Sequence, residues 1–180
     1  MSLEKISAQL SAKKNEQGSK MPPVELWDPP FCGDIDLQIK ANGDWFYNGT
    51  VFKRLSLVKL FASVLKKEAD KYFLVTPVEK VGITVEDAPF VLSQWCWLDD
   101  AQTMMQVTTN LDNEFLLGKE HPLTISEDGS LYVTVRRNLL AKVHRNVYYQ
   151  WVDLAKEVAT KKGKELVFTS TGMSFSLGVL

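Results

Sequence analysis

The sequence predicts an α+β protein made of two similar β-rich halves, each built from strands, one helix and a closing hairpin. Short segments of alternating or β-branched apolar residues recur between turn-forming Asn and Gly residues, as is typical of strands. Two segments carry apolar residues at helical spacing, residues 57–68 and the stretch after Asn146. The order of elements in residues 35–85 returns in residues 123–178. We therefore expect an internal duplication, with the strands of 90–117 added to the second half.

Length and composition fit this fold class. The chain has 180 residues, of which 45% are hydrophobic, enough for one domain or two small ones. Its net charge of -1 argues against a large basic surface for nucleic acid. No apolar run reaches the roughly 18 residues that span a bilayer, and the first residues lack the apolar core of a signal peptide. We expect a cytoplasmic protein with no nucleic-acid or membrane partner.

The first residues predict an N-terminal arm, 1–23, with a short helix over residues 3–10 and a polar, flexible remainder. The prolines of the next segment exclude a regular element there, so we expect it to lie extended with Trp27 and Phe31 against apolar surface. The arm precedes a first half over residues 24–88.

Strands of the first half are predicted over residues 35–40, 44–47 and 50–53, with turns at Asn42-Gly43 and Asn48-Gly49. An amphipathic helix follows over 57–68, with Phe61 in its apolar stripe. The half closes with a hairpin over 72–85, whose first strand ends at Pro77 because proline cannot donate a ladder hydrogen bond.

The second half is predicted over residues 89–180. Its strands are expected at 90–98, 102–109, 114–117, 123–126, 131–136 and 139–143, with a turn at Asp128-Gly129. A helix capped by Asn146 carries Trp151 in its apolar stripe and ends at Gly163. A last hairpin turns at Thr171-Gly172.

Charged residues at the ends of the 72–85 hairpin are the main site candidates. Glu79-Lys80 and Glu86-Asp87 are predicted to converge, where a carboxylate beside an ammonium group would orient a polar ligand and paired carboxylates would raise one pKa. The alternative is a solvated turn with weak surface ion pairs, and composition alone slightly favours it.

The densest basic run contains Arg136-Arg137. Because side chains alternate along a strand, only one of the two can face a cleft between the halves. An Arg there would clamp a phosphate or carboxylate, although a salt bridge to the acidic hairpin is the simpler role. Most aromatic residues should be core, and Trp45 or Tyr132 is a candidate to stack on a flat ligand.

Motifs for metals, phosphate loops and catalysis are not found. His121 and His144 have no HxH or HExxH spacing, and Cys32 and Cys96 have no CxxC partner or disulfide framework. Neither GxGxxG nor GxxxxGK[ST] occurs. We assign no catalytic residue, metal or cofactor.

Several blocks of the sequence resemble the bacterial domain-of-unknown-function 1285 family. The most specific are TPVEK at residues 76–80 and VEDAPF at residues 85–90, and the resemblance covers roughly residues 24–155. Asp99-Asp100-Ala101 departs from the glycine turn expected there. The resemblance implies a duplicated α+β core, a C-terminal half superficially like pleckstrin-homology domains, a nucleotide-like ligand between the halves and a role in signal transduction.

Together these observations favour a regulatory or sensory module that binds a small anionic ligand between its halves. The expected contacts come from Trp45, Arg54, Glu79, Lys80, Asp87, Tyr132 and Arg136. One alternative is a hydrolase or transferase with Glu79 or Asp87 as general base, which would require a water-excluded carboxylate. Another is an adaptor that adds a partner strand to an exposed sheet edge. The oligomeric state stays open.

Overall fold

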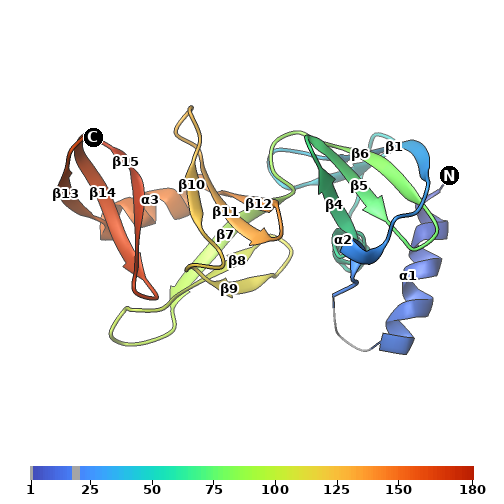
Figure 1. Cartoon of the computed structure of the whole chain (residues 1–180), viewed down its shortest axis with the longest axis horizontal. Coiled ribbons are helices and arrows are strands. Elements are labelled where there is room, and N and C mark those ends of the chain that lie inside the picture. Colours follow the sequence, from blue (N-terminus) through green and yellow to red (C-terminus); the bar gives the residue numbers. More distant parts are fainter. Residues whose placement is uncertain (1, 18–20) are drawn as a thin grey trace. The chain divides into compact units, whose positions relative to one another are not determined.

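The computed structural model describes residues 2–17 and 21–180 and is rich in strands. The chain divides into two compact units, residues 1–87 and residues 88–180. The first contains α1 (Leu3–Gln17), η1 (Val24–Leu26), β1 (Phe31–Ile39), β2 (Trp45–Tyr47), β3 (Thr50–Val51), α2 (Leu55–Ala62), β4 (Leu65–Glu68), β5 (Lys71–Val75) and β6 (Lys80–Val85). The second contains β7 (Phe90–Trp97), β8 (Met105–Thr109), β9 (Glu114–Leu116), β10 (Leu123–Ile125), β11 (Leu131–Arg136), β12 (Leu139–Val143), α3 (Arg145–Leu154), β13 (Lys156–Thr160), β14 (Gly163–Ser170) and β15 (Met173–Val179) (Figure 1).

Each unit is built on a six-stranded sheet with the same topology. The first sheet has the order β3-β2-β1-β6-β5-β4, and the second, read from its other edge, has the order β9-β8-β7-β12-β11-β10. In both, two antiparallel three-stranded meanders join through one parallel pair, β1 with β6 and β12 with β7. Strands β1 to β6 therefore correspond one by one to β7 to β12, and the predicted α+β fold with two similar halves is confirmed.

The spans of the repeat differ from the prediction. Residues 31–85 correspond to residues 90–143, whereas the sequence pattern had paired 35–85 with 123–178. Helix α2 lies between β3 and β4, but α3 follows β12, so the helices occupy different places in the two repeats. Strands β13, β14 and β15 form a separate three-stranded sheet instead of the hairpin of a repeat.

The glycine turns lie at the predicted positions, but Asn42-Gly43 does not form the two-residue hairpin that was expected there. Asn48-Gly49 and Thr171-Gly172 each have two positive φ angles, 48° with 76° and 50° with 74°, as two-residue hairpins of the primed type require. Asn42-Gly43 and Asp128-Gly129 lie in three-residue loops, closed by hydrogen bonds from Lys40 N to Asp44 O and from Ser126 N to Ser130 O.

Helix lengths were predicted less well than strands. Helix α1 continues to Gln17, past the short helix that was expected. Helix α2 ends at Ala62, so the predicted helix over 57–68 is wrong in its second half. There β4 pairs with β5, with Leu65 opposite Leu74. Cross-strand pairing overrides a helical pattern that is only local.

The C-terminal helix shows the same effect. Helix α3 ends at Leu154, and residues up to 160 belong to β13, which pairs with β14. The helix is capped by His144, whose Nδ1 accepts a hydrogen bond from the backbone N–H of Asn146, so Asn146 is not the cap.

The apolar stripes of the helices supply part of each core. Phe61 on α2 and Trp151 on α3 are 1% and 0% exposed, as predicted.

In the proline-rich segment, Trp27 is half-buried, but Phe31 is 55% exposed, so the expectation that Phe31 is covered is wrong. Its ring forms a T-shaped pair with the β5 residue Phe73, at 6.0 Å between centroids.

Candidate functional site

The turn between β5 and β6 is a compact, largely buried structure. Thr76 is fully buried, and its backbone N–H donates to Glu79 O at 2.8 Å, while its hydroxyl accepts from Glu79 N at 3.2 Å. The Glu79 side chain turns inward and is 7% exposed. It accepts a hydrogen bond from Nε2 of Gln9 on α1 at 2.9 Å. The predicted site residue Glu79 therefore connects the turn to α1.

Lys80 begins β6 and belongs to a group that we call the Lys80 cluster, comprising Lys66, Glu68, Phe73 and Lys80. The Nζ atoms of Lys80 and Lys66 lie 3.0 and 3.2 Å from the two carboxylate oxygens of Glu68. The Lys80 ammonium also lies 4.9 Å from the centroid of Phe73. Strand alternation brings these residues to one face, because Lys66 is opposite Phe73 in the β4–β5 pair.

The charges of the Lys80 cluster are coupled. The hydrogen bond from Lys80 is the main cause that lowers the pKa of the Glu68 carboxyl, and the bond from Lys66 acts in the same direction while slight burial opposes both. Glu68 thus carries a negative charge shared between two cations. The cluster is a set of two ammonium groups, one carboxylate and one aromatic ring.

Arg136 is the corresponding cation of the second unit. A register shift between Thr134 and Arg136 places Arg136 opposite Leu139, on the side of the sheet that faces the core. Its guanidinium carbon lies 5.0 Å from the centroid of Phe90. Burial, and secondarily the charge of Arg137, lowers the pKa of Arg136 to about 10. The simple alternation used in the sequence prediction could not anticipate this bulge.

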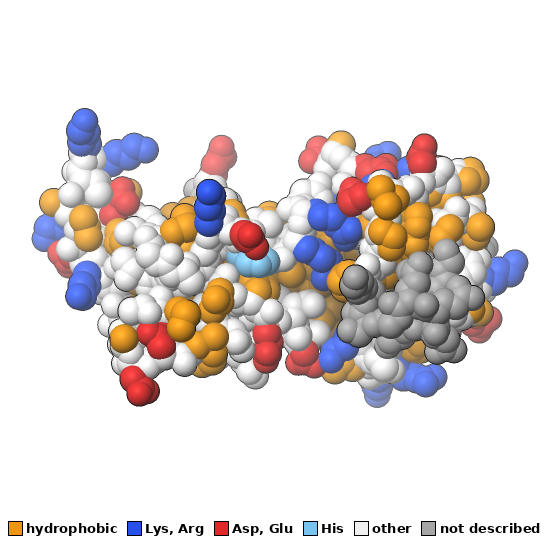
Figure 2. Space-filling model, turned by 60° about the horizontal axis from the view of Figure 1, so that its bottom comes forward, with side chains coloured by type: hydrophobic (Ala, Val, Ile, Leu, Met, Phe, Trp, Pro, Cys, Tyr) orange, Lys and Arg blue, Asp and Glu red, His pale blue; other side chains and the backbone are white. Residues whose placement is uncertain are grey.

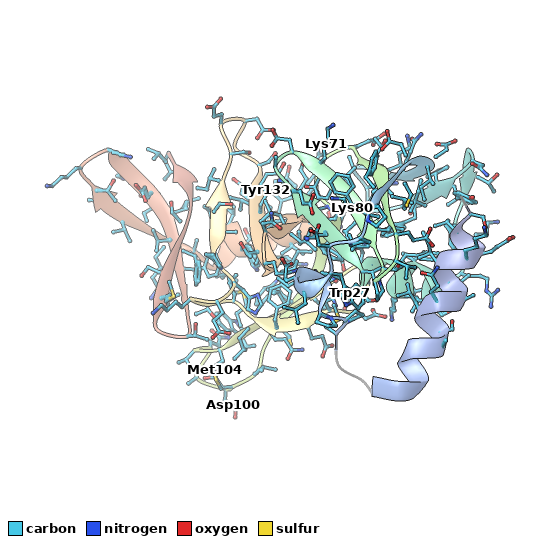
Figure 3. All side chains as sticks on the ribbon, turned by 45° about the vertical axis from the view of Figure 1, so that its right-hand side comes forward. Trp27, Lys71, Lys80, Asp100, Met104 and Tyr132 are labelled. Carbon is cyan, nitrogen blue, oxygen red and sulfur yellow. The ribbon has the colours of Figure 1, made fainter. Side chains whose placement is uncertain are left out.

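Lys80 and Arg136 occupy related places in the two repeats. Lys80 opens β6 after the β5–β6 turn, and Arg136 closes β11 before the β11–β12 turn. These two hairpins correspond in the repeat, because each leads into the strand that makes the parallel pair of its sheet. In each unit a half-buried cation lies over an aromatic ring at this hairpin. Figure 3 labels Lys80 on the first sheet and Tyr132 on β11 of the second.

The four charges expected to converge do not all meet. Glu79 and Lys80 lie at the start of β6, and Glu86 and Asp87 follow its end, about 20 Å away at the rise of a strand. Glu86 instead accepts from Lys40 Nζ at 2.8 Å and from the backbone N–H of Ala41 at 2.9 Å, so it fastens the β1–β2 loop. The prediction of a single charged cluster is wrong because β6 is continuous.

The remaining candidates have varied environments. Trp45 is only 2% exposed, so its ring is covered by the core of the first unit. Arg54 is exposed at the N-terminus of α2, and Asp87 is half-buried. Tyr132 is half-buried, with Lys142 Nζ 5.9 Å from its ring centroid. In each unit, the candidate residue that combines a half-buried cation with an aromatic ring is therefore the main site candidate: Lys80 in the first unit and Arg136 in the second.

Sequence reasoning missed three partners of these cations. Lys66 and Glu68 were assigned to a helix, because Leu-Lys-Lys-Glu at 65–68 does not alternate and carries no local strand signal. Phe90 was assigned to a strand but not linked to Arg136, because the link depends on the bulge in β11. No local signal in the sequence marks that bulge.

Charge is mixed on the surface seen in Figure 2, where basic and acidic side chains alternate with apolar ones. Within residues 2–17 and 21–180, no helix is long and apolar enough to cross a membrane. The same part of the chain contains no group of three or more His, Cys, Asp or Glu residues placed to hold a metal ion.

Comparison with known proteins assigns most of the chain, residues 22–177, to one family. Residues 22–88 match the family model described as domain of unknown function (DUF1285), N-terminal domain, and residues 89–177 match the model for the DUF1285 C-terminal domain. No curated protein matches the chain.

Two solved structures are similar to the chain. A DUF1285 family protein from Silicibacter pomeroyi is 36% identical with a TM-score of 0.79, and the match covers 95% of each chain. A DUF1285 family protein from Shewanella baltica is 34% identical with a TM-score of 0.54, covering 65% of this chain and 90% of the other.

Proposed function

Because the chain belongs to the DUF1285 family, whose two domains are described as of unknown function, we propose its role from its own residues. It is a regulatory or sensory module that binds a small anionic ligand, of nucleotide-like chemistry, and takes part in signal transduction in the cytoplasm. The proposal is one of binding rather than turnover.

Arg136 is the observation that carries this proposal. Its guanidinium is half-buried beside Phe90, and burial lowers its pKa. A cation in such a place interacts with an anion more strongly than one in bulk water, because the effective dielectric constant is lower. The planar guanidinium also offers paired donors that match a phosphate or carboxylate. An anionic ligand is therefore the chemistry to which this group is best suited.

The Lys80 cluster supports the same chemistry in the first unit. Two ammonium groups share the single carboxylate of Glu68, so these three charges sum to a net positive charge. The Lys80 side chain is 17% exposed, so part of it remains in contact with solvent. An anion that binds Lys80 or Lys66 would form an ion pair with that lysine in place of its ion pair with Glu68.

The environment of Glu79 favours binding over general-base catalysis. Its carboxylate is covered and already accepts a hydrogen bond from Gln9. A general base must reach the proton that it removes, within hydrogen-bond distance or through one water. Through its hydrogen bond to Gln9, Glu79 serves the fold of the first unit.

The proposal predicts saturable stabilisation of the protein by an anion. Thermal unfolding would be measured with AMP, GMP, ATP and inorganic phosphate, followed by calorimetric titration of any hit. A compound at 100 times its dissociation constant should raise the free energy of unfolding by about 2.7 kcal/mol. Arg136→Gln should weaken binding at least tenfold, and Arg136→Lys should restore it only in part because lysine lacks the paired donors. Lys80→Ala should also weaken binding.

Lys71→Ala and Lys162→Ala are matched controls, since each removes an exposed cation outside the two cation–aromatic groups. They should leave affinity unchanged. Equal weakening by all four charge removals would indicate only a general attraction for anions. A melting temperature that collapses in Lys80→Ala or Arg136→Gln while the response to the compound persists would identify these cations as structural braces.

A further inference from the structure

Helix α1 is attached to the first unit by one face of its first half. Leu3, Ile6 and Leu10 are 4%, 0% and 4% exposed, and the helix packs against α2. Figure 1 shows α1 as the blue helix at the N-terminal end of this unit. Residues 3–17 precede the family match, which begins at residue 22. Helix α1 is not hydrogen-bonded into the six-stranded sheet, so it can detach from the first unit without breaking the hydrogen bonds of that sheet.

The polar contact beneath α1 is incompletely satisfied. Gln9 Nε2 donates to Glu79 Oε1 at 2.9 Å, and among the described residues no other side chain donates to this carboxylate. The Oε1 atom of Gln9 is buried and, within the same residues, accepts no hydrogen bond. Burial removes the water molecules that would hydrogen-bond to these oxygens. The Glu79 carboxylate regains one hydrogen bond from a neutral donor, and the Gln9 amide oxygen regains none, so both groups are buried at a cost in free energy. The closed position of α1 is therefore held mainly by apolar contacts, and the Gln9–Glu79 pair adds a polar contact that is only partly satisfied.

We propose that α1 is a strap that opens and closes over the β5–β6 turn independently of the sheet, with Gln9–Glu79 as its latch. Closing covers Glu79, and opening returns its carboxylate to water. The strap would thereby control exposure of the turn that leads into Lys80, a ligand contact of the proposed function, and the inference rests on that function only for this consequence. The opening itself is a local unfolding of one helix, of the kind that native proteins undergo below their global unfolding.

Hydrogen–deuterium exchange of the full chain without ligand tests the strap. In the native protein the amides of α1 should exchange at least tenfold faster than those of β5 and β6, and their exchange should depend only weakly on denaturant. That outcome would place α1 in a cooperative unit separate from the sheet. Equal protection and equal denaturant dependence of α1 and the sheet would overturn the proposal.

Two substitutions separate a latch from an ordinary packing contact. Glu79→Gln should slow α1 exchange about tenfold, because the new amide can accept from Gln9 Nε2 and donate to the unsatisfied Gln9 Oε1 without a buried charge. Gln9→Ala should accelerate α1 exchange by a similar factor, because it leaves the carboxylate without its donor. Lys5→Gln, on the exposed side of α1, is the matched control and should change neither rate.

Whether Glu79→Gln slows or accelerates the exchange of α1 distinguishes the latch from an ordinary stabilising contact. If the charged hydrogen bond were a simple stabilising contact, Glu79→Gln would accelerate α1 exchange, and the latch would be refuted. Because no ligand is present, these rates do not depend on whether the protein binds an anion. Failure of the anion titrations would therefore leave the strap standing, and failure of the strap would leave the anion titrations valid.

Discussion

Asp128 shows how a single exposed carboxylate is controlled by its immediate neighbours. It lies in the β10–β11 loop and accepts hydrogen bonds from the hydroxyl groups of Ser126 and Ser130 and from the backbone N–H of Ser130. The Ser126 hydrogen bond is the main cause that lowers the pKa of Asp128 from 3.8 to about 2, with the Ser130 bonds contributing next. The loop is thus stabilised by the ionised form of this one residue.

The lowered pKa of Asp128 predicts a pH-dependent part of stability. Because the folded-state pKa lies below that of the unfolded chain, the contribution is complete above about 3.8 and is lost as the pH falls through about 2. When the pH is lowered from about 3.8 to about 2, the free energy of unfolding should therefore fall less in Asp128→Asn than in the native chain. Urea unfolding at each pH measures this difference. Asp100→Asn, an exposed residue of the β7–β8 loop, serves as control. A carboxyl NMR titration of Asp128 with a midpoint at or above 3.8 would contradict the prediction.

Residues of the candidate site show why charge alone was an incomplete guide. Lys80 was predicted from its block, and its partner Glu68 was not, because the partner comes from another strand. Trp45 was predicted as a stacking residue and is instead covered by the core. A sequence names the groups that have the right chemistry, but burial depends on neighbours that are distant in the chain.

Helix α2 gives a test of how one element contributes to stability. Phe61 is 1% exposed, and its ring meets Phe52 edge-on at 5.9 Å between centroids. Phe61→Ala should lower the free energy of unfolding by about 3–5 kcal/mol, because it removes a buried ring and leaves a cavity. Leu55→Ala on the same helix removes a side chain that is 46% exposed, and should change stability by less than about 1 kcal/mol. Chemical denaturation measures both, and similar losses in the two variants would mean that the buried face of α2 has been misassigned.

Elements were predicted most accurately where a turn fixed them. The Asn48-Gly49 and Thr171-Gly172 hairpins have the positive φ angles that their residue types favour. The ends of α2 and α3 were not predicted, because Leu65 and the residues after Leu154 join strands through pairing with β5 and β14. Turn chemistry is local, whereas the choice between one more helical turn and a strand is settled by an available partner.

At the scale of the whole molecule, the second unit contains two sheets that are joined by buried hydrogen bonds. The β14–β15 hairpin places Ser170 beside the six-stranded sheet, where its hydroxyl accepts from Met105 N at 3.0 Å and donates to Leu117 O at 2.8 Å. Next to this contact, a Cβ atom on Gly118 would lie 2.5 Å from the Thr171 hydroxyl, which itself donates to Leu117 O. A side chain at residue 118 would therefore require the Thr171 hydroxyl to move.

Ser170→Ala tests this connection between the sheets. The variant leaves the buried Met105 N–H without its acceptor, while Leu117 O keeps the hydrogen bond from the Thr171 hydroxyl. We therefore expect a loss of about 1–3 kcal/mol in the free energy of unfolding. Ser174→Ala on β15, where the side chain is exposed, should have little effect. Urea unfolding measures both variants. If Ser170→Ala were as stable as the native chain, the buried hydroxyl would not connect the two sheets energetically.

The duplication was predicted correctly, but its register was not. The loops at Asn42-Gly43 and Asp128-Gly129 look alike, and each precedes strands and a helix, which suggested that they were equivalent. In the structure the first follows a central strand, β1, and the second follows an edge strand, β10. The same short loop can close any antiparallel hairpin, so it carries no information on a strand's place in the sheet.

The sequence by itself determined the α+β class, the existence of two similar halves, the glycine turns, the buried faces of α2 and α3, and the family. These properties follow from residues near one another in the chain, whose spacing sets backbone angles and apolar faces. Only the tertiary structure decided the parallel pairing of β1 with β6 and of β12 with β7, the bulge that turns Arg136 toward Phe90, and the covering of Glu79 by α1. Each of these joins segments far apart in the sequence, and the free energy that selects them comes from pairing and burial that no single segment contains.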